Sequence, residues 1–182
     1  MTFGALRGIH RACVLSRNTP KITHELLRDC PRPIPTKYDG YHFRFRTEAR
    51  YAVLWKACYW PYEYERQGFA LERGPYLPDF HFPQHGAWLE VKGVEPSFQE
   101  QDLCECLAVE TRQPVVIAWG QPSWEGVAIL FTPDGDRQLV ALSGFLLRWA
   151  SVNTLTKAIN AARSARFEHG EQPRIPDLRV VT

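Results

Sequence analysis

A predicted β-hairpin in residues 76–92 constrains the fold of this chain more than any other feature. Residues 76–82 and 87–91 are short and mostly apolar, and Pro83-Gln84-His85-Gly86 lies between them. Proline and glycine at the ends of a four-residue segment are typical of a turn between two strands. We therefore expect an antiparallel pair of strands with Gln84-His85 at its tip.

The hairpin decides which polar side chains lie together. With that tip, Asp79 lies opposite Glu90, and Leu77 lies opposite Lys92. Directly opposed residues have Cβ atoms about 4.5–5.5 Å apart. The two carboxylates are then close enough to share a divalent cation, and too close for both to stay ionised without one. Lys92 shares the face of Glu90, roughly 6–7 Å away along the strand. A register shifted by one residue would separate the two carboxylates.

Apolar periodicity predicts the other elements. Helical spacing predicts helices over residues 44–58 and 97–111, and short apolar runs predict further strands over residues 62–71, 114–119 and 127–131. From residue 44 the order is helix, three strands, helix, strand, and then a further strand and a mixed tail. This order predicts the α/β class, with a mixed β-sheet flanked by helices.

Charge and proline content divide the chain, whose 182 residues suffice for one domain with short extensions. Residues 1–37, 38–136 and 137–182 carry net charges of +5, −7 and +4. Cys30-Pro31-Arg32-Pro33-Ile34-Pro35 excludes a helix or a central strand. We expect a basic N-terminal arm with a proline-rich linker, an acidic core and a basic C-terminal helical extension. This pattern suits a metal site beside a polyanion, although uneven solvated surfaces would carry the same charges.

Two short motifs, Pro78-Asp79 and Glu90-Val91-Lys92, resemble the two halves of the signature of the PD-(D/E)xK nuclease superfamily. The resemblance covers residues 44–120 and implies a restriction-endonuclease-like core in the order αβββαβ, with N- and C-terminal extensions. The tract Tyr62-Glu63-Tyr64-Glu65 is similar to resolvase-like, transposon-end-cleaving and phage-encoded members, and residues 161–170 resemble the tails of phage-encoded members. The family implies a metal-dependent DNA endonuclease, here a phage-encoded and structure-selective one.

The residue types suit phosphodiester hydrolysis. Asp79 and Glu90 are hard oxygen ligands for Mg²⁺, with Mn²⁺ as a substitute, and the Val91 carbonyl can add a third oxygen. Lys92 can hold or deprotonate the attacking water and stabilise developing negative charge. In the family a glutamate on the preceding helix often completes the metal site, and Glu48 occupies that position. The resemblance therefore implies a Mg²⁺-dependent deoxyribonuclease with these four side chains in its catalytic site.

Contacts to nucleic acid are expected outside this cluster. Gln99 or Gln101, at the start of the second helix, can position the scissile phosphate, and the sequence does not choose between them. Lys157, Arg163 and Arg166 lie among small residues of a predicted tail helix and can follow phosphates, although an ordinary exposed helix has the same pattern. The expected partner is DNA, and relatives that cut both strands suggest a homodimer.

Each catalytic candidate has an ordinary explanation when it is taken alone. Glu48 can favour a helix N-terminus, Asp79 after a proline can form a turn, and Glu90 with Lys92 can be a solvated pair. The nuclease interpretation requires all of them together. Two alternative functions stay open: a catalytically silent nucleic-acid- or protein-binding module on the same fold, and a nuclease subunit activated by a partner.

Other chemistries and locations have less support. Cys104 and Cys106 are two residues apart on a predicted helix and do not face one ion, and the chain has no P-loop, dinucleotide or nucleophile-elbow motif. Five cysteines without framework spacing favour reduced thiols, as in the cytoplasm of a prokaryote or a phage-infected cell. No apolar run reaches the ~18–20 residues that span a bilayer, so no membrane partner is expected.

Overall fold

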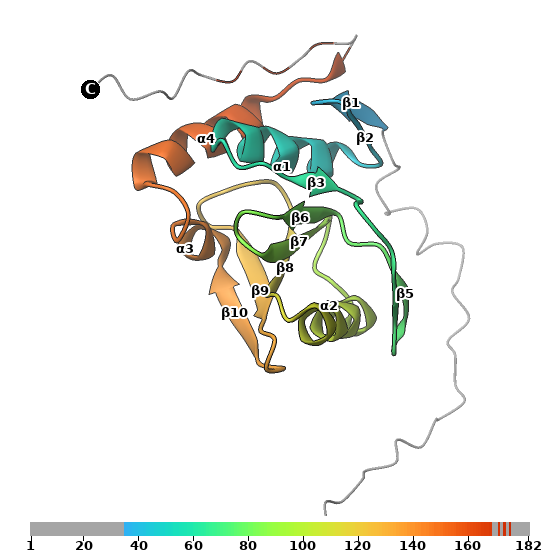
Figure 1. The fold of residues 1–182 in the computed structure, drawn as a ribbon. Coiled ribbons are helices and arrows are strands. Elements are labelled where there is room, and N and C mark those ends of the chain that lie inside the picture. The colour runs from blue at the N-terminus through green and yellow to red at the C-terminus, as the bar shows by residue number, and fades with distance from the viewer. Residues whose placement is uncertain (1–34, 169–170, 172, 174, 176–182) are drawn as a thin grey trace, which may run out of the picture. The chain divides into compact units, whose positions relative to one another are not determined.

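The computed structural model describes residues 35–168, 171, 173 and 175. Its helices are α1 (Arg46–Ala57), α2 (Phe98–Thr111), α3 (Leu142–Leu146) and α4 (Val152–Ser164). Its strands are β1 (Thr36–Tyr38), β2 (Tyr41–Phe43), β3 (Glu63–Tyr64), β4 (Phe69–Leu71), β5 (Gly74–Tyr76), β6 (Phe80–Phe82), β7 (Ala87–Lys92), β8 (Val115–Trp119), β9 (Val127–Phe131) and β10 (Arg137–Ala141) (Figure 1).

A six-stranded mixed sheet organises the described residues. Its strand order is β10-β9-β8-β7-β6-β3. Strands β7 and β8 are parallel, and α2 connects them, while the other neighbours are antiparallel. Two small hairpins, β1–β2 and β4–β5, lie outside this sheet. The expected α/β class with a mixed sheet flanked by helices is therefore confirmed.

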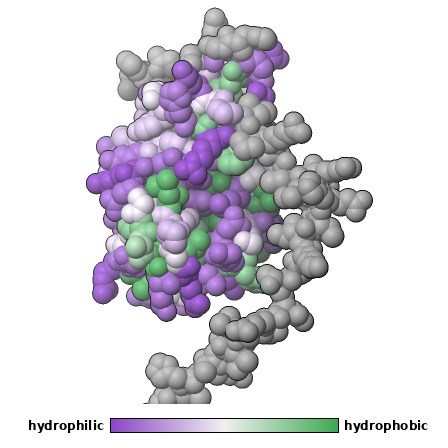
Figure 2. All heavy atoms as spheres, turned by 90° about the vertical axis from the view of Figure 1, so that its right-hand side faces the viewer, coloured by the Kyte–Doolittle hydropathy of each residue, from purple (hydrophilic) through white to green (hydrophobic). Residues whose placement is uncertain are grey.

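Helices cover both faces of the sheet (Figure 1). Alternate strand residues divide between two apolar clusters: Phe80, Leu89 and Val116 pack with α1, while Trp88 and Ile117 pack with α2. Helix α1 lies between the sheet and α4, and the segment Tyr51-Ala52-Val53-Leu54-Trp55 is buried throughout. A helix that is apolar all round is a buried helix, so this sequence requires cover on both sides. The face at the right of Figure 1 is mostly hydrophilic, with hydrophobic residues between (Figure 2).

The structure confirms the predicted hairpin and its register. Phe80 pairs with Leu89, His81 with Trp88 and Phe82 with Ala87, in the register that sets Asp79 opposite Glu90. In the turn, the Gly86 amide donates to the Phe82 carbonyl at 2.9 Å. Gly86 has a φ of +56°, a conformation that glycine adopts without strain.

Two expected strands are each broken into two short ones. Residues 62–71 form β3 and β4, and residues 76–82 contain the end of β5 and the whole of β6. Pro78, which cannot donate a ladder hydrogen bond, lies between β5 and β6. Leu77 precedes β6, so its expected pairing with Lys92 is absent from the strand pairs of the described residues. The predicted helices and the strands over residues 87–91, 114–119 and 127–131 are confirmed within a few residues.

The expected boundary at residue 136 does not separate two structural units. Strand β10 pairs with β9 over five residues and so belongs to the main sheet. Helices α3 and α4 contribute Phe145, Leu155 and Ile159 to the core beside α1. One compact unit spans this boundary. Most of the expected basic arm, residues 1–34, lies outside the described residues. In the described part of the chain, no helix is long and apolar enough to cross a membrane.

Candidate active site

Asp79 and Glu90 lie together where β6 and β7 stop pairing. The Asp79 amide donates to Glu90 Oε2 at 3.1 Å, and the Val91 amide donates to Asp79 Oδ2 at 2.8 Å. Each carboxylate thus accepts a hydrogen bond from a backbone N–H of the opposite segment, where a longer pair of strands would form its next backbone–backbone hydrogen bond. Both residues are buried, with Asp79 8% and Glu90 3% exposed. The predicted carboxylate pair is therefore present as a buried pair.

Lys92 provides the positive charge beside this pair. Its Nζ lies 2.8 Å from Glu90 Oε1 and 3.1 Å from Glu100 Oε1. Glu100 is the third residue of α2, and its other carboxylate oxygen accepts from the Ser97 amide and hydroxyl, both at 2.8 Å. This capping box holds the first turn of α2 against the end of β7. The Lys92 ammonium is consequently fixed between two carboxylates from different elements.

The site holds more buried acidic groups than basic ones, and this imbalance shifts their pKa values. Burial, and then the charges of Glu90 and Glu48, raise the pKa of Asp79 well above its ordinary value, although the Val91 amide and Lys92 oppose this shift. Burial alone would lower the pKa of Lys92, but Glu90, Asp79 and Glu100 raise it above its ordinary value. Lys92 is therefore a stable ammonium here, which favours its electrostatic role over a role as a base.

Glu48 lies next to the pair but is engaged elsewhere. Its Oε2 accepts from the Arg44 amide at 3.1 Å, the Phe45 amide at 3.3 Å and the Tyr64 hydroxyl at 2.7 Å. Burial raises the pKa of Glu48 despite these hydrogen bonds. The charge of Glu48 also contributes to the raised pKa of Asp79, so the two carboxylates are neighbours. Glu48 therefore completes the acidic cluster from the start of α1 and also caps that helix.

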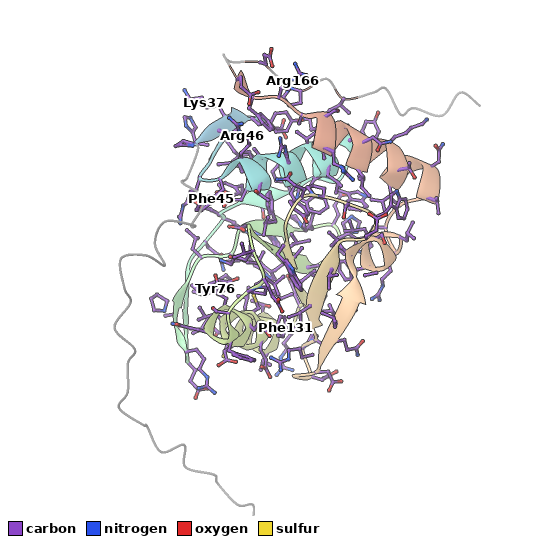
Figure 3. The ribbon with its side chains drawn as sticks, turned by 180° about the vertical axis from the view of Figure 1, so that it is seen from behind. Lys37, Phe45, Arg46, Tyr76, Phe131 and Arg166 are labelled. Carbon is purple, nitrogen blue, oxygen red and sulfur yellow. The ribbon has the colours of Figure 1, made fainter. Side chains whose placement is uncertain are left out.

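The sequence analysis missed three residues that enclose the cluster. Tyr64 binds Glu48, Glu100 binds Lys92, and the Tyr76 hydroxyl lies 3.3 Å from Cys104 Sγ. The charges of Glu90 and Asp79 raise the pKa values of Tyr76 and Cys104 further, after burial, so both lie beside the acids. Figure 3 shows Tyr76 on the same side of the molecule as Phe45, at the start of α1. The Ser97-x-x-Glu100 capping signature could have identified Glu100.

Val91, Gln99 and Gln101 were also expected to contact the metal ion or the phosphate. The Val91 carbonyl was expected as a third metal ligand, and the contact that Val91 makes to Asp79 is through its amide, which donates to Asp79 Oδ2. Gln99 is exposed on α2, whereas Gln101 is buried and donates from Nε2 to the Pro96 carbonyl at 2.9 Å. Gln101 Oε1 accepts from Arg137 at 3.1 Å. Neither glutamine makes a hydrogen bond to Asp79, Glu90 or Lys92 within the described residues.

The basic residues of α4 lie away from the acidic pair. Lys157 and Arg163 are exposed on α4, which α1 separates from the sheet (Figure 1). Arg166 is exposed just beyond the end of α4 at Ser164, so it lies outside the helix that the sequence predicted for it. Arg163 and Arg166 line a hollow of about 610 Å³ together with Arg50 of α1. Glu168 and Glu171 line the same hollow. The structure thus brings two of these three residues together, but not next to Asp79 and Glu90.

The donor set fits a hard divalent cation. Asp79 and Glu90 are both buried, and the pKa of Asp79 is raised. The lysine beside them, Lys92, also forms an ion pair with Glu100. Mg²⁺ binds through one or two carboxylates and retains several waters, so Asp79 and Glu90 suffice as protein ligands. In the described ranges, no group of three His, Cys, Asp or Glu side chains is arranged to hold a metal ion. The Glu48 carboxylate accepts from two backbone amides and the Tyr64 hydroxyl at the start of α1.

Replacing Asp79 by asparagine should stabilise the metal-free protein at neutral and higher pH. The raised pKa of Asp79 means that the folded state holds a proton that the unfolded state releases, so stability falls as pH rises above the ordinary aspartate range. Asparagine keeps an oxygen for the Val91 amide and does not ionise. In a chelator at about pH 8 we expect a melting temperature at least ~2 °C higher than wild type, with a smaller difference at about pH 5. An unchanged pH profile would show that Asp79 is not a strained carboxyl.

Comparison of the chain with protein-family models, with curated proteins and with solved structures found no match.

Proposed function

We propose that this protein is a metal-dependent DNA endonuclease built on a restriction-endonuclease-like core. The observation that carries the proposal is the buried pair Asp79–Glu90 with Lys92 bound to Glu90 at 2.8 Å. A structural ion pair needs one carboxylate, whereas this cluster has a surplus of acids, and burial together with the charges of Glu90 and Glu48 raises the pKa of Asp79. A divalent cation relieves that repulsion, so the arrangement suits a metal site better than a purely structural one.

Each side chain has a distinct part in the proposed hydrolysis. Mg²⁺, when bound by Asp79 and Glu90, supplies charge neutralisation at the phosphate and activation of water. Lys92, whose pKa is raised by Glu90, Asp79 and Glu100 against the effect of burial, stabilises as an ammonium the negative charge that develops on the phosphate and holds the attacking water. Glu48 shapes the acidic end of the site from the start of α1 and is held by Tyr64 at 2.7 Å. Glu48 is thus a positioning residue, and the proposed catalytic set is Asp79, Glu90 and Lys92.

The direct test is cleavage by the purified full-length protein. Plasmid, linear, branched and single-stranded DNA should be incubated with Mg²⁺, Mn²⁺ or a chelator, with Glu90→Gln as the inactive variant and Glu110→Gln, on the exposed part of α2, as its matched control. We expect metal-dependent internal cleavage by wild type and the control only. Binding of DNA without any cleavage would support the silent-module alternative, and cleavage only after addition of host extract would support the partner-activated subunit.

The basic hollow predicts a salt-dependent contribution to DNA binding. Deletion of α4 would expose the core, so we propose the double variant Arg163→Ala, Arg166→Ala instead. If each arginine contacts a phosphate, the slope of log affinity against log salt should become less steep by about 0.9 per contact. Arg73→Ala is the control, because Arg73 lines a hollow with Glu72, Asp102 and Glu105 on the α2 side. An unchanged slope in fluorescence titrations would remove α4 from the DNA-binding surface.

A further inference from the structure

A row of side chains leads from the acidic pair to the far edge of the sheet. Glu90 of β7 pairs with Ile117 of β8, Ile117 with Ile129 of β9, and Ile129 with Leu139 of β10. Paired residues point to the same face, which is the face covered by α2. The row crosses three strand spacings, so Leu139 lies about 14 Å from Glu90. One face therefore carries both the acidic pair and the exposed edge strand.

A groove lies at the end of this row, beside the first turn of α2. Its volume is about 390 Å³, and Pro96, Phe98, Ile129 and Leu139 form its apolar walls. Phe98 is 79% exposed and Leu139 is 73% exposed. Two large apolar side chains so exposed on one groove contribute little to the fold, and this points to a binding surface.

The polar end of the groove is held in place by hydrogen bonds. Gln101 is buried, donates to the Pro96 carbonyl at 2.9 Å and accepts from Arg137 Nη1 at 3.1 Å. The Pro96 carbonyl fixes the nitrogen end of the Gln101 amide, and the oxygen end then orients Arg137. Gln101 is therefore a positioning residue. The other N–H groups of the Arg137 fork remain available to a ligand, because Gln101 takes only one of its five donors. Glu95 also lines the groove.

We propose that this groove binds one unpaired nucleobase, guanine in preference to the others, in a DNA strand that passes the acidic pair. The proposal rests on the proposed endonuclease function. Phe98 supplies a stacking surface of the kind that binds single-stranded bases. The Arg137 fork matches the O6 and N7 acceptors of guanine, and Glu95 can accept from its N1 and N2 donors. Because Glu95 offsets the charge of Arg137, the groove suits a neutral base better than a phosphate.

The distance fits a strand that occupies both sites. About 14 Å corresponds to about four steps of stacked DNA at ~3.4 Å each, and to fewer steps in an unstacked strand. The bound base therefore lies a few nucleotides from the scissile phosphate. A substrate with unpaired bases near the cut enters this groove, whereas a continuous duplex keeps its bases stacked. We therefore expect the groove to favour branched or single-stranded DNA over a continuous duplex.

The test is binding of short oligonucleotides to the full-length protein in a chelator, where cleavage does not occur. The probes are fluorescein-labelled thymidine oligomers that carry one central guanine, adenine or abasic site. We expect the guanine probe to bind wild type about tenfold more tightly than the abasic probe. Phe98→Ala should remove most of this difference, and Arg137→Ala should remove the preference for guanine over adenine. Arg137→Lys keeps the charge but loses the fork, so it should also lose the preference.

Controls and opposing results separate the groove from the active site. Arg73→Ala, on the other side of α2, should bind the guanine probe like wild type. Phe98 is so exposed that its removal should leave the circular dichroism and melting temperature unchanged. Equal affinity for all three probes, no binding at all, or unchanged binding by Phe98→Ala would overturn the proposal. If guanine-selective binding is found but no metal ion supports cleavage, the groove stands and the endonuclease function fails.

Discussion

Lys92→Ala is expected to slow DNA cleavage by about 10²–10³-fold, the usual effect of removing one donor that stabilises charge in the transition state. The Lys92 ammonium, bound to Glu90 at 2.8 Å, lies beside the proposed metal ligands and stabilises charge that appears only in the transition state. Loss of such an interaction lowers the rate while it changes ground-state binding far less. The matched measurements are single-turnover cleavage in Mg²⁺ and a DNA-binding titration in Ca²⁺.

Lys92→Arg should restore little of the lost rate. A planar guanidinium keeps the charge but does not place it at the same point between Glu90 and Glu100. Lys56→Ala is a suitable control, because Lys56 forms an exposed ion pair with Asp39 at the other end of α1. Cleavage by Lys92→Ala at a rate near that of wild type would make Lys92 a structural partner of Glu90, and the endonuclease proposal would lose its catalytic residue.

Asp79→Ala is expected to abolish both Mg²⁺-dependent cleavage and measurable Mn²⁺ binding. Asp79 and Glu90 are the proposed protein ligands, and one remaining carboxylate paired with Lys92 leaves no net charge to hold a divalent ion. The protein should still fold, because the substitution removes a carboxyl whose burial and repulsion by Glu90 raise its pKa and disfavour its charged form. Calorimetric titration with Mn²⁺ measures the binding, with Glu110→Ala as the control. Wild-type Mn²⁺ affinity in the Asp79 variant would contradict a shared ion.

The hairpin at the centre of the site was predictable because its signals are local. The turn sequence places the tip at Gln84-His85, and that register sets Asp79 opposite Glu90. Helix α2 was predictable for a similar reason, since its capping residue and its buried face both lie within one short segment. Turn, register and capping signals of this kind lie within a few consecutive residues, so they can be read directly from the sequence.

Hydrogen bonds between distant segments were not predictable in this way. Glu48 was expected near the metal, but Tyr64 and two backbone amides bind its carboxylate. Gln99 or Gln101 was expected to reach the scissile phosphate, but Gln101 orients Arg137, which is 36 positions away in the chain. A polar side chain that becomes buried takes whichever partner the packing brings to it, and no local pattern records that choice.

The sequence by itself determined the α/β class, the two main helices, the hairpin register and the shared face of Glu90 and Lys92, because periodicity and turn chemistry act over a few residues. Only the tertiary structure decided that β10 joins the sheet and that α4 covers α1. It also decided that Glu100 and Tyr64 enclose the acidic cluster. The physical reason is that burial and charge compensation depend on segments far apart in the chain, which meet only when the domain is packed.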